Sequence, residues 1–132
     1  MLDADRYARI VRASALYDLI VTLALATPWT FGLLHGMVSA LDAGLGVPGD
    51  VPAANALTVL MANLMGSVVV VWSVARLRLR LNVLGRYDAA ARFLFAAWQL
   101  DALVSGVSWV ILPLLLVEVG FGVLQALPVR DR

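Results

Sequence analysis

The apolar stretch over residues 89–127 constrains this chain more than any other feature. It is 39 residues long, and as one helix it would extend about 58 Å, roughly twice the hydrocarbon core of a bilayer. The chain must therefore fold back within it. Residues 105–108, Ser-Gly-Val-Ser, form the plausible break, and Pro113 suits the first turn of a following helix. We expect helices over about 89–106 and 109–127, the last one beginning between Ser108 and Leu112.

Two earlier segments, residues 13–34 and 55–75, each provide the roughly 20 apolar residues that a helix needs to cross a bilayer. The chain is 62% hydrophobic and 14% charged, with a mean hydropathy of +0.90. A soluble chain of 132 residues could not bury that much apolar surface. The sequence therefore predicts a single integral membrane domain, residues 1–132, folded as an all-α bundle of four transmembrane helices in up-down-up-down order.

All ten basic residues are arginines, and they fall on one side of this arrangement. They precede the first span, lie between the second and third spans or just inside the third, or follow the fourth: Arg6, Arg9, Arg12, Arg76, Arg78, Arg80, Arg86, Arg92, Arg130 and Arg132. Basic residues mark the cytoplasmic side of a membrane. We therefore expect a multi-pass protein of the bacterial inner (cytoplasmic) membrane with both termini in the cytoplasm.

A cleavable signal peptide is the alternative reading of the N-terminus, because the Ala-Leu-Ala at residues 24–26 resembles a cleavage motif. Two observations argue against it. Asp18 would interrupt the apolar core of such a signal, and removal of the segment would leave three spans instead of an even number.

Several local patterns also carry expectations. Residues 37–50 are expected to form an outer loop, and the glycines within 44–49 match the dinucleotide fingerprint by chance, since no strand precedes them. Asp50 and Asp88 are expected to cap the second and third helices. The alternating Arg-Leu run over 76–81 is expected to extend the second helix along the membrane surface, its arginines facing anionic headgroups.

Three carboxylates lie within the predicted spans: Asp18, Asp101 and Glu118. A charge at mid-bilayer costs from about 3 to more than 10 kcal/mol, so such groups usually face the interior of a bundle. Asp18, Glu118 and Arg92 are expected at a similar depth in the cytoplasmic half, with Arg92 paired to at least one acid. Either a functional role or structural ion pairing explains Asp18 and Glu118.

Asp101 is expected in the outer half, near Asn63 and Gln99, without a basic partner. With Asp18, Arg92 and Glu118, these residues make up the predicted ligand- or proton-binding candidates. Serines, threonines and glycines beside them at helical spacing are better explained as packing between helices. No catalytic residue is identified. With one histidine and no cysteine, neither a metal site nor a cofactor is predicted, and a net charge of +1 gives no reason to expect nucleic acid.

The four spans, the cytoplasmic ends, the Tyr17-Asp18 pair early in the first helix and the arginine-rich connection over 76–86 resemble the small DoxX-like membrane proteins of bacteria. That group includes subunits associated with quinol oxidation and many proteins of unknown role. The resemblance implies the overall span pattern, and no functional residue is carried over from it.

Three functions remain open. The first is binding of a small apolar or lipid-like ligand, such as a quinone or isoprenoid, or an accessory role in a membrane complex. The second is a proton-coupled small transporter working as a homo-oligomer. The third is a small membrane isomerase or cyclase that uses carboxylates. We favour the first, without enzymatic activity, because a lone bundle of 132 residues has little room for a transport pathway.

Overall fold

The computed structural model describes residues 2–130, and they are mainly helical. The helices are α1 (Ala4–Leu23), α2 (Pro28–Leu45), α3 (Ala56–Leu79), α4 (Asn82–Val104) and α5 (Leu112–Ala126), with a 3₁₀ turn, η1 (Trp109–Ile111), leading into α5. Two short strands, β1 (Leu2–Asp3) and β2 (Val129–Arg130), pair in parallel and join the two ends of the chain.

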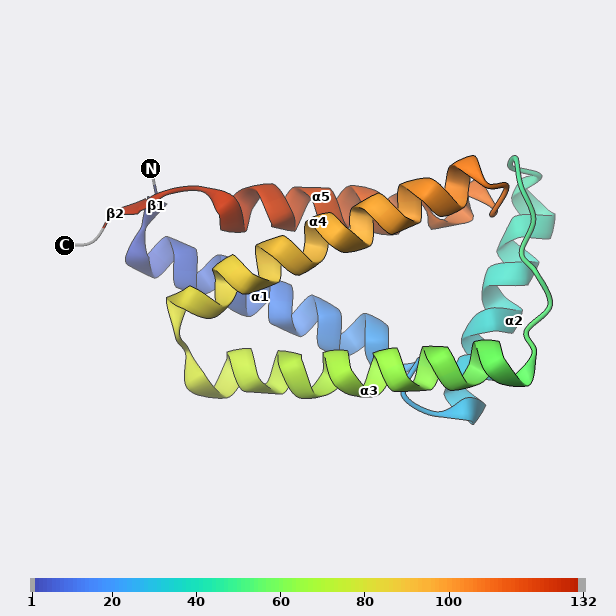
Figure 1. Ribbon diagram of the computed structural model, residues 1–132, viewed down its shortest axis with the longest axis horizontal. Helices are drawn as coiled ribbons and strands as arrows, with labels where there is room; N and C mark the ends of the chain where they lie inside the picture. Colours follow the sequence, from blue (N-terminus) through green and yellow to red (C-terminus); the bar gives the residue numbers. More distant parts are fainter. Residues whose placement is uncertain (1, 131–132) are drawn as a thin grey trace.

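Helices α1, α3, α4 and α5 run lengthwise and α2 crosses one end of them (Figure 1). Both termini lie at the opposite end, which also carries the connection from α3 to α4 (Figure 1). α1 packs along α3 and α4 packs along α5, whereas contacts between these two pairs are fewer. The molecule is therefore built from two helix pairs, and α3 and α4, although consecutive in the chain, belong to different pairs.

Within residues 2–130, two helical segments are long and apolar enough to cross a bilayer: α3 and the continuous stretch Trp109–Ala126. α1 and α2 would provide a third crossing together, as a pair bent by 94°. α4, which carries two arginines and two aspartates, is not among them. The structure thus supports an all-helical protein with two to three membrane-crossing segments.

Polarity is distributed in the opposite way to that of a soluble protein. Large apolar side chains are exposed on the outer faces, among them Val68 at 68% and Val104 at 81% exposed, while Arg76 and Arg92 are 2% and 1% exposed. Exposed apolar surface on this scale marks contact with lipid or another apolar partner. The interior instead collects the charges, because an unpaired charge facing lipid is costly.

The first predicted span, residues 13–34, is not one helix. α1 begins at Ala4, capped by Asp3, whose side chain accepts a 2.7 Å hydrogen bond from the Arg6 amide, and it ends at Leu23. Thr27 then adopts an extended conformation and caps α2, whose first residue is Pro28. Proline disfavours helical geometry in the residue before it and has no N–H to continue a helix, so the chain turns here.

The predicted outer loop is also wrong for most of its length, since α2 continues to Leu45 and ends at Gly46, whose φ of 58° is left-handed. Asp50 does not cap the next helix. Asn55 does, accepting a 2.9 Å bond from the Thr58 amide. The backbone of Asp50 instead joins the hairpin between α4 and η1, donating to the Gly106 carbonyl at 3.0 Å. The glycine motif sits at a helix end, without the preceding strand that a dinucleotide site needs.

Of the other predicted helix boundaries, some are confirmed and one is wrong. α4 ends at Val104 and η1 begins at Trp109, which confirms the predicted break. α3 continues to Leu79, which confirms that the Arg-Leu run extends this helix. Asp88 is not a cap, because α4 begins six residues earlier, at Asn82, and the side chain of Asp88 is buried within the helix.

Candidate functional site

Five charged side chains meet in the half of the bundle nearer the termini. They come from all four lengthwise helices, and we call them the charge cluster: Asp18 of α1, Arg76 of α3, Asp88 and Arg92 of α4, and Glu118 of α5. The side chains of the two arginines are 0% and 1% exposed, and those of the acids are between 4% and 12% exposed. The cluster therefore joins the two helix pairs through ions removed from solvent.

Arg92 is the centre of the cluster. Its Nη2 lies 2.7 Å from Asp18, its Nη1 lies 2.8 Å from Glu118 and its Nε lies 3.0 Å from Asp88. The prediction that Arg92 pairs with at least one of Asp18 and Glu118 is confirmed, since it pairs with both. One guanidinium thus ties α1, α4 and α5 together, which its planar fork of donors permits.

Arg76 forms the second link. Its Nη2 lies 2.5 Å from Asp18 and its Nη1 lies 2.6 Å from Asp88. Asp18 and Asp88 consequently each accept from both arginines, while Glu118 pairs with Arg92 alone among the described residues. The prediction that Arg76 faces anionic headgroups is wrong, because its guanidinium points between α1 and α4.

Neutral side chains complete the hydrogen bonding. Ser14 is fully buried, donates to Asp88 at 2.9 Å and accepts from both Arg92 and Arg76, at 2.7 and 3.0 Å. Trp72 donates through its indole N–H to Asp88 at 2.9 Å. Buried charges are tolerated where such secondary bonds satisfy their remaining donors and lone pairs.

Helical spacing explains how the sequence brings these groups together. Ser14 and Asp18 are four residues apart on α1, as are Asp88 and Arg92 on α4, and residues at that spacing share a face. Asp18, Arg92 and Glu118 were predicted from the sequence as inward-facing charges, whereas Arg76 and Asp88 were not. The Asp88–Arg92 spacing was the available signal for Asp88, since it places the acid on the same face as an arginine already expected to point inward.

The cluster contains two guanidinium groups and three carboxylates, so it carries one excess negative charge when every group is ionised. Glu118 is the acid with the fewest partners. Its Oε2 accepts from Arg92, and no described residue bonds its Oε1. A carboxylate oxygen is thus left available to a hydrogen-bond donor or a cation.

A cavity of about 170 Å³ reaches the cluster from the side, and we call it the lateral cleft. Its apolar lining is Val68, Val69 and Trp72 of α3 and Ala91 and Phe95 of α4, and four members of the charge cluster also line it: Asp18, Asp88, Arg92 and Glu118. It lies between consecutive helices that belong to different pairs. The arrangement can hold a small group with an apolar body and a polar end.

The other predicted candidates are not part of the cluster. Asp101 is exposed near the end of α4 and makes no ion pair within residues 2–130. Asn63 donates a 2.7 Å bond to the Leu25 carbonyl, which attaches α3 to the turn between α1 and α2. Gln99 is half-buried, and its Oε1 has no partner among the described side chains and backbone. The structure does not bring these three to the lateral cleft.

Among the residues that the structure describes, no group of three or more histidine, cysteine or acidic side chains is arranged to hold a metal ion. Comparison of the chain with protein-family models, with curated proteins and with solved structures found no match. The resemblance to DoxX-like proteins therefore stays a prediction, and the geometry of the cluster and the cleft is what indicates a function.

Proposed function

We propose that this chain is a four-span protein of the bacterial inner membrane, with both termini in the cytoplasm, that binds a small lipid-like molecule in the lateral cleft. The observation that supports the proposal is a cleft lined both by apolar side chains and by the charged side chains of Glu118 and Arg92. Binding sites for small molecules typically combine apolar walls with a few convergent polar groups. Structural ion pairing is enough to explain the buried charges. The proposal of a binding function therefore rests on the cleft.

The size of the cleft limits how the ligand lies. Typical ligand pockets measure about 300–1,000 Å³, whereas this cleft measures about 170 Å³. It can enclose a ring or a polar head but not a long molecule. Val68, which lines the cleft, is 68% exposed, and Phe95 is 39% exposed. The remainder of a lipid-like ligand would therefore lie along the apolar outer faces of α3 and α4.

The polar end of the ligand meets complementary chemistry. Glu118 offers an acceptor oxygen and Arg92 brings positive charge to the same end of the cleft. A hydroxyl or carbonyl group attached to an apolar body suits this pair, as in a quinone-like ring or an isoprenoid alcohol. A fully apolar molecule would leave these polar groups without partners, which is costly in a dry site.

Mass spectrometry of lipids and small molecules that copurify with the protein tests this proposal. Ala91 lines the cleft and Ala90, its neighbour on α4, is exposed. Ala91→Leu should fill the cleft and remove the bound molecule, while Ala90→Leu, which adds the same side chain outside the cleft, should retain it. A molecule that stays bound to Ala91→Leu in the wild-type amount would contradict the proposal.

The orientation has its own test. A reporter fused after Arg132 should read as cytoplasmic, and one inserted near Gly46 as periplasmic, because the arginines lie on one side of the predicted spans. A periplasmic signal from the C-terminal fusion would contradict the four-span arrangement without bearing on ligand binding.

A further inference from the structure

A second cavity, of about 190 Å³, lies between α1 and the connection from α3 to α4. We call it the basic cavity. Arg9 and Arg12 line it from α1, and Arg80 lines it from the end of α3. No residue lines both the basic cavity and the lateral cleft. It is therefore a separate site that the proposed cleft ligand does not use.

The charges around this cavity are of one sign. Arg9, Arg12 and Arg80 make no ion pair with any described residue, whereas Arg6, at the start of α1, is paired with Asp3 at 3.2 Å. No carboxylate lines the cavity. Three guanidinium groups without ion-pair partners beside one cavity indicate an anionic ligand. Arginine is the side chain best suited to bind a phosphate, because its planar donors match the phosphate oxygens.

A buried donor points to the same conclusion. Arg76 also lines the basic cavity, and its side chain is 0% exposed. Its two terminal nitrogens are engaged by the charge cluster, but its Nε–H is buried and has no acceptor within the described part of the chain. Buried donors are nearly always satisfied, so a bound group would complete this side chain if the cavity walls moved to expose its Nε–H.

The backbone at Arg80 is a third observation. Arg80 ends α3 with a φ of 52° and is the one non-glycine residue with positive φ that the structure describes. Helices that end this way usually place glycine there, because it has no Cβ to clash. Strained backbone of this kind gathers at binding sites. Arginine at this position keeps a guanidinium beside the cavity where glycine would fit the backbone better.

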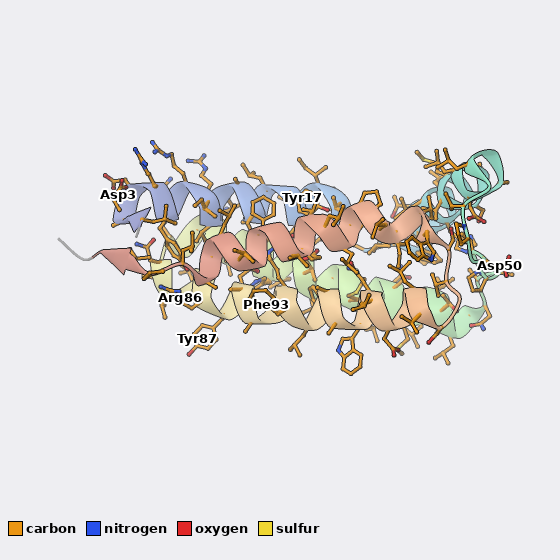
Figure 2. All side chains as sticks on the ribbon, turned by 90° about the horizontal axis from the view of Figure 1, so that it is seen from above. Asp3, Tyr17, Asp50, Arg86, Tyr87 and Phe93 are labelled. Atoms are coloured by element: carbon orange, nitrogen blue, oxygen red, sulfur yellow. The ribbon has the colours of Figure 1, made fainter. Side chains whose placement is uncertain are left out.

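The position of the basic cavity in the bundle indicates which class of anion it binds. The basic cavity lies at the end of the bundle that carries the termini (Figure 1), the same end at which Figure 2 places Asp3 and Arg86, with Asp50 at the other end. Its remaining walls include Val11, Leu77 and Leu81. Apolar walls beside arginines at the level where helices leave the bilayer suit a molecule that has both a phosphate and acyl chains.

We propose that the basic cavity binds the phosphate of an anionic phospholipid, held by Arg9, Arg12 and Arg80, with its acyl chains directed along the apolar surface of α1 and α3. The lipid would thus lie beside Arg76, which lines the basic cavity and also belongs to the charge cluster.

The test is a titration of the purified protein in neutral detergent with short-chain phosphatidylglycerol and, in parallel, with phosphatidylcholine of the same chains. The protein should bind the anionic lipid more tightly, with affinity falling as salt rises. Arg9→Gln and Arg12→Gln should each weaken binding about fivefold, the usual contribution of one arginine near anionic lipid. Arg78→Gln, an equal charge change on the same helix end outside the cavity, should change it less than about twofold.

Arg80→Gly separates folding from binding. Glycine suits the left-handed backbone, so the melting temperature in detergent should stay the same or rise, while affinity for phosphatidylglycerol falls about fivefold. Ala91→Leu, which fills the lateral cleft, should leave that affinity unchanged.

Three results would each overturn the proposal. The first is equal binding of the two lipids. The second is a loss with Arg78→Gln as large as that with Arg80→Gly. The third is inorganic phosphate alone binding as tightly as phosphatidylglycerol, which would make the ligand a soluble phosphate.

Discussion

The two halves of the bundle are held together by different means. Nearer the termini, the four lengthwise helices meet through the charge cluster, whose arginines bridge both helix pairs. Nearer α2, the chain is joined by backbone hydrogen bonds, such as those between Asp50 and the hairpin at Gly106 and Ser108. Close approach of Gly66 to the turn at Leu25 adds to these. Within residues 2–130, ion pairs between side chains are confined to the first half, and both cavities open beside it.

The difference shows how an apolar chain specifies its packing. Lipid tails are as apolar as the helix surfaces, so helices in a membrane are not driven together by the hydrophobic effect. Polar bonds and small residues must do this instead. The half near the termini uses strong pairs that are costly to break, while the half near α2 uses many weaker contacts. Substitutions in the half near the termini should therefore lower the stability of the protein more than substitutions in the half near α2.

The largest effect is expected for Arg92→Leu. It would leave Arg76 alone with Asp18 and Asp88 and remove the one ion-pair partner that Glu118 has in the described part of the chain. Breaking one side of a buried ionic network costs about 3–5 kcal/mol, and unfolding in detergent should show this as a large fall in melting temperature. Arg78→Leu, at an exposed position, is the matched control. Equal melting temperatures for the two variants would mean that the cluster contributes little to stability.

Gly66→Ala should have a smaller effect in the other half. A Cβ at Gly66 would lie 2.7 Å from the backbone carbon of Leu25, so α3 or the turn would have to move. Such overpacking costs about 1–3 kcal/mol. Gly120→Ala on α5 is the control, because nothing lies within 4 Å of its added Cβ, and it should be neutral or slightly stabilising. Equal unfolding free energies for the two variants would show that the close approach at Gly66 does not stabilise the half near α2.

The smallest effect is expected for Asp101→Asn. Asp101 is exposed and has no ion-pair partner in the described structure, and such surface changes stay within about 0.5 kcal/mol. The amount of copurified ligand should also be unchanged, because Asp101 does not line the lateral cleft. If the variant folds normally but loses that ligand, the site extends into the half near α2 and the contrast between the halves fails.

Hydropathy and helical spacing were enough to predict a helical protein with apolar outer surfaces and a break at residues 105–108. They were also enough to pair Arg92 with Asp18 and Glu118, because each of these charges is expensive to leave in lipid and all three were expected at a similar depth. These features depend on how apolar each segment is and on how far apart its residues lie along a helix. Both quantities follow from the order of the residues alone.

Tertiary structure decided the remainder. The run Arg76-Leu-Arg-Leu-Arg has no preferred face by itself, and the packing of α1 against α3 selects Arg76 to point inward and leaves Arg78 and Arg80 exposed. Asp88 became a core residue because α4 begins at Asn82. The rotation of a helix about its axis and the position of its first turn depend on the neighbours against which it packs. Those neighbours are brought together only when the two helix pairs assemble.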